Sequence, residues 1–380
     1  MRDQFGFTNL GNLFLCAVNG AVYCVSVLYA GRFAQRRGYL VALRRGVLIM
    51  GGALLLGSGV ISKATNQVMA QLALMVVWTG GMSLTWPALE AITSEGEPPA
   101  RLQRLLGIYN LVWAGCSALA YFGGGALLER WGHRSIFLVP AALHGCQWAI
   151  VWWLQREDRL RPIAVSECVP VPALPSHETE RRRSPVPAAR FLRMAWVANP
   201  FAYIAVNALV PVIPNLAERL GLGPMLAGFF CSTWLFARAG SFLVLWLWTA
   251  WHYRFRWLVG AYVAMSVCFV IILLGHSLGV LLLAQVVFGS AVGLLYYSSL
   301  YYSMDVGETK GEHGGFHEAA IGAGICIGPA VGAGSLVALP GWPNMNTWAV
   351  AGLLAAGLGW LMTLRRVRTA EKPGESRLEG

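Results

Sequence analysis

The chain has few charged residues for its length. Asp, Glu, Lys and Arg make up 12% of its 380 residues, whereas an ordinary soluble protein carries about 25%. Apolar residues reach 56%, and so few charges cannot cover the surface of a water-soluble fold. A membrane span needs about 20 apolar residues, so the chain has room for roughly eleven or twelve spans. The composition nearly excludes a soluble enzyme and predicts an all-α integral membrane protein.

Several catalytic and cofactor-binding motifs are also missing. The sequence has no GxxxxGK[ST] motif for nucleotide phosphates, no HExxH and no GxSxG. Its eight cysteines include no CxxC pair, so neither a disulfide framework nor a zinc framework is expected. The segment GAGICIG at 322–328 resembles a dinucleotide fingerprint, but it lies inside an apolar run with no strand before it. We expect no enzyme activity, no cofactor and no metal.

Apolar runs bounded by charges or by Gly, Pro and Asn predict eleven membrane helices in two sets. The first set covers 10–30, 46–62, 69–92, 104–128 and 135–155, and the second covers 191–215, 225–250, 257–275, 278–303, 314–338 and 346–364. Between the sets, six prolines and the run 181–183 of three arginines indicate an unstructured tether. The predicted organisation is therefore a five-span bundle (1–155), a linker (156–190), a six-span bundle (191–366) and a tail (367–380).

Lys and Arg are distributed unevenly between the two sides of the predicted spans. The net charge is +11, and 23 of the 29 basic residues fall on one side, five on the other and one inside a helix. Loops rich in Lys and Arg stay in the cytoplasm. The linker and the C-terminus are therefore predicted to be cytoplasmic, in the cytoplasmic membrane if the source is prokaryotic. The basic balance then reflects orientation in a lipid bilayer, and no nucleic-acid partner is expected.

The two predicted bundles contain a weak internal repeat. GIYNLVWAGCSALAYFGGGAL (107–127) aligns with GFHEAAIGAGICIGPAVGAGS (315–335) at an offset of 208 residues. Small residues recur at every fourth position in both segments, which lets helix backbones approach closely in lipid: Cys116, Ala120 and Gly124 in the first, and Gly324, Gly328 and Gly332 in the second. Generic helix packing explains the small residues but not their matching place in each bundle. Internal repeats around a central site are typical of secondary transporters.

Three segments resemble the signatures of the major facilitator superfamily. They are the loop GRFAQRRGYLVALRRG (31–46), with Gly31, Arg36, Gly38, Arg44 and Arg45 in the signature positions, the turn LLERWGHRSIF (127–137), and GICIGPAVGAG (324–334), with Gly324, Gly328, Pro329 and Gly332. The Pro-rich linker also fits, and the similarity covers nearly the whole chain. The resemblance implies two bundles around a central cavity, with the signature loop controlling their motion and the glycines packing helices.

The chain departs from the family pattern at several positions. Gln35 replaces the acidic residue of the signature loop, so the charge pair that the family uses as a latch is weakened or absent. Val76 stands where the family often has an arginine, and Leu119–Ala120 replaces the Gly-Pro signature in the first bundle. The last two differences argue against a typical proton-driven drug exporter. The resemblance also implies that the family's first helix is missing, and we favour a misassigned start over a degenerate copy.

Arg238 lies about halfway through the predicted helix at 225–250, with no acidic residue near it in sequence. A charge at this depth costs at least about 2.5–3.5 kcal/mol, so it needs a reason. It could be a structural arginine bonded to carbonyl groups or to a polar neighbour. We favour a cavity cation that binds an anionic or strongly polar solute, because a guanidinium offers five donors in a fixed fork.

Other polar residues recur on single faces of three predicted helices. They are Thr79, Ser83, Trp86 and Glu90 on 69–92, Asn199, Tyr203 and Asn207 on 191–215, and Ser290, Tyr297 and Tyr301 on 278–303. Hydrogen bonding between helices would leave the same pattern. By resemblance these helices face the central cavity, so we expect Glu90 to handle protons and the others, with Arg238, to bind a solute.

His317 and Glu318 open the predicted helix at 314–338. We favour capping of this helix as their role, ahead of a proton relay or gate through His317 and Glu318, which would use the fact that histidine titrates near neutrality. Glu90 is a separate candidate for proton handling. His313 and His317 have a metal-ligand spacing, but Gly314–Gly315 between them makes a continuous helix doubtful, and we do not expect a metal.

The features together predict a secondary transporter that moves a small polar or anionic organic solute by alternating access. A proton or ion could be coupled, and a monomer is expected. A transport-dead sensor or scaffold is the main alternative. An integral-membrane transferase that uses Glu312, His313, His317 and Glu318 is a weaker one, because it leaves the repeat unexplained.

Overall fold

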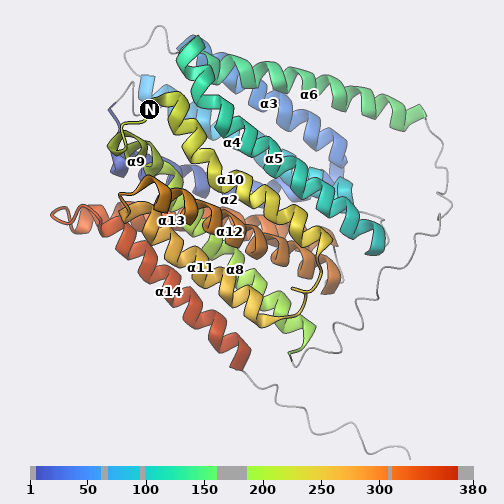
Figure 1. Ribbon diagram of the computed structural model, residues 1–380. Helices are drawn as coiled ribbons and strands as arrows, with labels where there is room; N and C mark the ends of the chain where they lie inside the picture. The colour runs from blue at the N-terminus through green and yellow to red at the C-terminus, as the bar shows by residue number, and fades with distance from the viewer. Residues whose placement is uncertain (1–5, 61–66, 95–98, 161–185, 307–309, 367–380) are drawn as a thin grey trace, which may run out of the picture.

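The structure is a computed structural model, and it describes residues 6–60, 67–94, 99–160, 186–306 and 310–366. Throughout these ranges the regular structure is helical (Figure 1). The first half contains α2 (Asn9–Arg37), α3 (Tyr39–Val60), α4 (Gln67–Ser94), α5 (Pro99–Trp131) and α6 (Ser135–Leu160). The second half contains α8 (Ala188–Leu209), η1 (Val210–Val212), α9 (Ile213–Arg219), α10 (Pro224–Leu247), α11 (Phe255–Leu274), α12 (Leu278–Val306), α13 (Lys310–Ala338) and α14 (Met345–Arg366).

Eleven of the helices in these ranges are long and apolar enough to cross a membrane. Each contains at least 18 residues and an apolar stretch with few charges, which suits the hydrocarbon thickness of a bilayer. The predicted fold class, an all-α integral membrane protein with about eleven spans, is therefore confirmed. Most of the predicted linker and the whole predicted tail lie outside the described residues.

The helices form two groups, α2–α6 and α8–α14. Within the groups, close packing joins α3 to both α4 and α6, α10 to α12, and α13 to α8, and the groups meet mainly along two helix pairs, α2 with α13 and α5 with α10 (Figure 1). Figure 1 shows α3 and α6 on one outer side and α14 on the other, with α2, α5, α10 and α13 between them. Residues that face the middle of the molecule therefore come from both halves of the chain.

Glycines allow the helices of each pair, α2 with α13 and α5 with α10, to approach closely. A Cβ atom at Gly20 of α2 would lie 2.4 Å from the backbone nitrogen of Cys326 in α13. A Cβ atom at Gly125 of α5 would lie 2.1 Å from the carbonyl oxygen of Pro224 in α10. Because such distances are far below van der Waals contact, both positions require glycine in this arrangement. Backbone approach of this kind is how membrane helices associate without a hydrophobic driving force.

The predicted packing glycines of α13 serve two different contacts. Cβ atoms at Gly324 and Gly328 would lie 2.6 Å from the carbonyl oxygen of Pro200 and 2.4 Å from that of Ile204, so these glycines pack α13 against α8 within the second group. Gly332 instead faces Leu13 of α2, with 3.4 Å from its Cβ position to the leucine side chain. Pro329 lies inside α13.

Three predicted boundaries were wrong. The basic loop at 31–45 is mostly helix, because α2 continues to Arg37 and α3 begins at Tyr39, with only Gly38 between them at φ 94°. The helix at 191–215 ends at Leu209, and Pro211 and Pro214 start the short elements that follow, because proline lacks the backbone N–H that an α-helix needs. Gly314 and Gly315 do not interrupt α13, which begins at Lys310.

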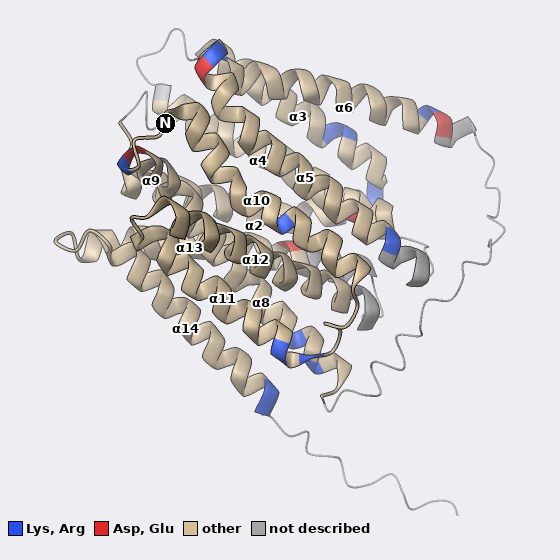
Figure 2. Cartoon of the chain, viewed as in Figure 1, with Lys and Arg blue, Asp and Glu red and all other residues tan. Residues whose placement is uncertain are grey.

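Basic residues mark one end of the molecule, which we call the basic end. Figure 2 shows them at the C-terminal ends of α2 and α14 and near the N-terminal ends of α3, α5, α8 and α11. Arginines close the last turn of α2 (Arg36 and Arg37) and of α14 (Arg365 and Arg366). The C-terminal ends of α4 and α12 and the N-terminal end of α13 therefore lie toward the basic end.

Candidate functional site

Arg238 lies in the middle of α10 and is 6% exposed. Its guanidinium carbon is 4.6 Å from the ring centre of Trp113 in α5 and 5.0 Å from that of Trp234, one turn earlier in α10. Within the part of the chain that the structure describes, Arg238 Nε is buried without a hydrogen-bond partner. The contacts of the guanidinium plane are therefore cation–π contacts, and not the carbonyl bonds of a purely structural arginine.

Aromatic rings from both helix groups surround this guanidinium. Trp113 contacts Tyr296 of α12 and Phe242 of α10 at centroid distances of 5.4 and 5.8 Å, and it meets Trp86 of α4 at 6.2 Å. Trp86, which the sequence placed in the solute site, thus reaches Arg238 through Trp113. Such a box holds the planar guanidinium in one orientation, because cation–π attraction acts across the ring faces.

Tyrosines continue the polar environment away from Arg238. Tyr203 of α8, Tyr296 and Tyr121 all lie within electrostatic range of the guanidinium. The rings of Tyr203 and Tyr296 are 6.2 Å apart. Tyr203 and Tyr296 are also in electrostatic range of Glu90 and Glu318, and so is Tyr109 of α5. The tyrosines therefore form a polar connection between Arg238 and a pair of buried carboxyl groups.

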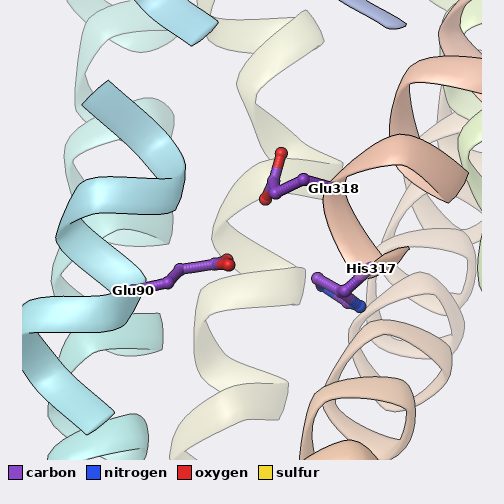
Figure 3. A group of neighbouring side chains, drawn as sticks. All are labelled: Glu90, His317 and Glu318. Atoms are coloured by element: carbon purple, nitrogen blue, oxygen red, sulfur yellow. The ribbon is translucent and has the colours of Figure 1, made fainter. Parts of the chain in front are cut away.

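These carboxyl groups meet a histidine at the contact between the two helix groups (Figure 3). Glu90 extends from α4, while His317 and Glu318 extend from α13, and one ligating atom from each lies within 4.8 Å of the other two. All three are buried, at 3%, 1% and 5% exposure. We call Glu90, His317 and Glu318 the acidic triad. The structure thus brings together the three residues that were predicted separately for proton handling.

Neighbouring hydroxyl groups fix the acidic triad. Tyr23 of α2 donates its hydroxyl hydrogen to Glu318 Oε2. Ser299 Oγ of α12 lies 3.2 Å from His317 Nδ1, and the ring of Tyr296 packs edge-on against the imidazole at 5.3 Å. Two negative charges this close would repel by about 3 kcal/mol at an effective dielectric of about 20. The pair therefore requires a proton or another cation between the carboxyl groups.

The other predicted residues of α8 face the same region. Asn199 is fully buried one turn before Tyr203, and among the described residues neither its amide oxygen nor its amide nitrogen has a partner. Asn207 Nδ2 donates to the carbonyl oxygen of Tyr203 at 2.9 Å. On α8, the Asn207 amide is therefore bonded to its own helix, whereas the Asn199 amide is available to donate and accept hydrogen bonds.

The polar stripe of α4 is largely satisfied inside the first group. Thr79 donates its hydroxyl hydrogen to Asn19 Oδ1 of α2, and Ser83 Oγ donates to the carbonyl oxygen of Gly80 at 2.9 Å. These two residues therefore connect helices or bond their own turn, whereas Trp86 and Glu90 on the same stripe reach the aromatic box and the acidic triad.

The predicted stripe of α12 lies beside the aromatic box, where the ring of Tyr297 is 5.9 Å from that of Phe242. Tyr297 and Tyr301 pack on Trp251 at centroid distances of 5.7 and 5.4 Å, and Tyr301 stacks on His252 at 4.1 Å. Ser290 Oγ donates to the carbonyl oxygen of Val286 at 2.9 Å in an exposed position. Tyr296, Tyr109 and Trp113, which the sequence reasoning missed, occupy the site instead. Gly289 and Gly293 mark the face of α12 that approaches α10, but their spacing does not distinguish Tyr296 from Tyr297.

The predicted signature loop lies away from these residues, at the basic end. Gln35 and Arg36 are exposed, Arg44 is half-buried, and the guanidinium carbon of Arg45 is 5.1 Å from the ring centre of Phe33. Around Gly31, the Cβ position has open space. The side chains of Glu312 and His313, which the transferase alternative needs, lie outside the described residues.

A cavity of about 960 Å³ opens between the two helix groups toward the end opposite the basic end. It is lined mainly by apolar side chains and glycines of α5, η1, α9 and α10, together with Glu218 and Tyr121. Tyr121 lies within electrostatic range of Arg238. Tyr121 is therefore both a lining residue of the cavity and a neighbour of the buried guanidinium in electrostatic terms.

Comparisons with known proteins agree with this architecture. The family model described as Major Facilitator Superfamily matches residues 1–312. The crystal structure of the human organic anion transporter MFSD10 (TETRAN) is similar, with a TM-score of 0.65 at 15% identity, over 92% of this chain and 83% of that chain. At this identity the likeness shows a shared fold alone. A search among curated proteins finds no match.

Proposed function

Because this chain belongs to the major facilitator superfamily, a family of membrane transporters, we propose that it moves a small anionic or strongly polar organic solute by alternating access. The helix groups α2–α6 (Asn9–Leu160) and α8–α14 (Ala188–Arg366), which correspond to the predicted bundles 1–155 and 191–366, are the two units that rock about the central site in this proposal. The transporting unit in this proposal is a monomer. The basic end faces the cytoplasm, as the distribution of Lys and Arg indicates.

Arg238 carries the proposal. It is a buried cation between aromatic rings of both helix groups, and within the described ranges it has no acidic partner. A buried charge without a partner is costly, and an incoming anion would relieve this cost. The guanidinium fork suits carboxylate, sulfate or phosphate groups, which accept two parallel hydrogen bonds. The structurally similar human protein MFSD10 is an organic anion transporter, which is compatible with this choice.

The solute would reach Arg238 through the cavity beside Tyr121. Tyr203, Tyr296 and the amide of Asn199 would contact the uncharged part of the solute, since all three carry donors and acceptors in an otherwise apolar region. Aromatic rings around a polar group favour organic solutes that have a flat or apolar portion. Inorganic ions would use little of this lining.

The acidic triad would couple transport to a cation, most simply a proton. Glu90 belongs to one helix group and His317 and Glu318 belong to the other, so protonation changes the interaction between the groups that must move. Tyr203 and Tyr296 connect the triad to Arg238 electrostatically. Occupation of one site can therefore change the affinity of the other, which is the physical requirement for coupling.

The test is uptake of radiolabelled organic anions into proteoliposomes. Wild-type protein is expected to take up a benzoate-like anion faster than its amide analogue. Arg238→Gln is expected to reduce anion uptake at least tenfold, because losing one partner of a buried charge interaction costs about 2–5 kcal/mol. Arg238→Lys should retain part of the activity, since it keeps the charge without the fork.

Arg130→Gln is the matched control, because Arg130 is exposed at the end opposite the basic end. Reconstitution of each variant is checked by its monodisperse elution in detergent. Wild-type anion uptake by well-folded Arg238→Gln would show that Arg238 does not bind the solute.

A further inference from the structure

The acidic triad has the composition of a metal site as well as that of a proton site. It offers two carboxyl groups and one imidazole, and one ligating atom from each lies within 4.8 Å of the others. All three side chains are at least nine-tenths buried. Figure 3 shows Glu90 reaching from α4 toward the imidazole and the Glu318 carboxyl group on α13.

His317 supplies an independent indication of a ligand. Its Nε2 atom is buried and, among the described residues, has no hydrogen-bond partner. Its other nitrogen, Nδ1, lies 3.2 Å from Ser299 Oγ. When Ser299 accepts the hydrogen of Nδ1, Nε2 carries the lone pair that a metal ion binds. Metal-ligating histidines in proteins have their second nitrogen bonded in this way.

The surroundings of Glu318 fit the same role. The Tyr23 hydroxyl group donates to Glu318 Oε2, which fixes the orientation of the group. The Glu90 and Glu318 carboxyl groups are close enough to share a proton, and a cation would take the place of that proton. The packing of Tyr296 against His317 fixes the imidazole. Outer contacts of this kind orient ligands and contribute to the affinity of metal sites.

We propose that Glu90, His317 and Glu318 bind one divalent transition-metal ion of the Mn²⁺, Fe²⁺, Co²⁺ and Zn²⁺ series. The imidazole favours these ions over Mg²⁺ and Ca²⁺, which prefer sites made of oxygen atoms alone. The two carboxylates balance the charge of a divalent ion inside an apolar bundle. The ion and a proton would compete for the same carboxylate oxygens.

The ion would connect the two helix groups. Glu90 lies on α4 of the first group, whereas His317 and Glu318 lie on α13 of the second. A ligand that binds only when both sides are together stabilises this arrangement and opposes its opening. If the protein transports as proposed above, a bound ion would inhibit that transport by holding the groups together. Binding of the ion itself does not depend on the proposed transport.

The test uses the purified full chain in lipid nanodiscs, freed of metal by a chelator and then titrated with Co²⁺, with no solute present. The readouts are the visible absorption of bound Co²⁺ and the thermal unfolding midpoint with and without Zn²⁺. We expect one ion per chain and a visible absorption spectrum typical of Co²⁺ with a nitrogen ligand. We also expect a higher unfolding midpoint with Zn²⁺ than with an equal concentration of Mg²⁺.

Variants identify the ligands. Glu90→Gln and His317→Gln should each weaken Co²⁺ binding at least tenfold, and Tyr23→Phe should weaken it by about 10–100-fold, as outer contacts of metal sites do. His276→Gln, which removes an exposed histidine, should bind as the wild type does. Absence of Co²⁺ binding to wild-type protein, or equal stabilisation by Mg²⁺ and Zn²⁺, would overturn the proposal even if every variant misfolded. Binding by Glu90→Gln and His317→Gln that equals the wild type would also overturn it.

Discussion

Replacing Gly20 by alanine tests whether backbone contact between α2 and α13 holds the two helix groups together. The added Cβ atom would lie 2.4 Å from the nitrogen and 2.7 Å from the Cα atom of Cys326, and 2.5 Å from the carbonyl carbon of Ile325. These are backbone atoms of a helix, so no side chain can rotate away to make room. The helices must separate by about 1 Å to restore ordinary van der Waals distances.

The cost of this separation follows from known overpacking effects. Inserting a methyl group into a packed interior typically costs about 1–3 kcal/mol. Alanine also favours a helix over glycine by about 1 kcal/mol, which partly hides the steric cost. Gly31→Ala, in the same helix, receives this helical gain without a clash, because its Cβ position has open space. The difference between the two variants therefore isolates the contact.

The assay is reversible unfolding of each variant in mixed detergent micelles, followed by helical circular dichroism. Gly31→Ala should match or exceed the wild-type free energy of unfolding, and Gly20→Ala should fall about 1–3 kcal/mol below Gly31→Ala. A cost of this size would also shift the equilibrium between packed and separated groups by roughly 5–150-fold. If Gly20→Ala were as stable as Gly31→Ala, α2 and α13 would not be in backbone contact at this position.

Three further substitutions test other parts of the molecule. Trp113→Leu removes one of the aromatic rings around Arg238, a contact worth about 0.5–2 kcal/mol. It should therefore weaken binding of an organic anion by roughly 2–30-fold in an equilibrium titration. Unchanged affinity would show that Trp113 does not support anion binding by Arg238. Asn199→Leu should leave the thermal stability unchanged or raise it, because it removes a buried amide that has no partner among the described residues. It should nevertheless lower anion uptake. Lower stability with normal uptake would indicate that Asn199 has a structural role. Gly38→Ala should destabilise the protein by about 1–3 kcal/mol, because its φ of 94° and ψ of 142° lie in a region that essentially only glycine adopts. Gly52→Ala, whose Cβ position is open, serves as its control and should cause no loss.

The number and order of the helices could be predicted because long apolar runs have few other stable structures. Their ends could not be predicted as well. Basic residues after residue 31 indicated a loop, but an arginine or lysine continues a helix without difficulty once the helix leaves the bilayer. Only Gly38, with its positive φ, interrupts the helices there. Further along the chain the two prolines near residue 212 ended α8 earlier than its hydropathy indicated.

A candidate site residue could be selected from the sequence where it stands out from its surroundings. Arg238 did so, as a basic residue in the middle of a predicted apolar helix, and the structure places it between Trp113 of α5 and Trp234 of its own helix; that it binds a solute stays a prediction. On α12 the polar stripe did not identify the inward face, because this helix is apolar on nearly all sides and adjacent tyrosines point in different directions. Tyr297 packs on Trp251 and lines a small pocket with Leu106 and Asn110 of α5, whereas Tyr296 lies within electrostatic range of Arg238.

The meeting of Glu90 with His317 and Glu318 could not be derived from sequence spacing. Each was a candidate by itself, but they lie in different halves of the chain, and their contact depends on how the two helix groups pack. Glycines in α2 and α13 permit this packing, and their partners become evident only in three dimensions. Tyr23, which orients Glu318, carried no signal in the sequence beyond being a tyrosine in an apolar run.

In the proposed function, the helix groups α2–α6 and α8–α14 carry a solute across the membrane by alternating access. The most direct test is counterflow in proteoliposomes loaded with a high concentration of an unlabelled organic anion, with a trace of the same labelled anion outside and no ion gradient. Alternating access predicts transient accumulation of label above equilibrium for wild-type protein, and none for Arg238→Gln. Uptake without such an overshoot would indicate a channel, and no exchange for any organic anion tested would contradict the claim.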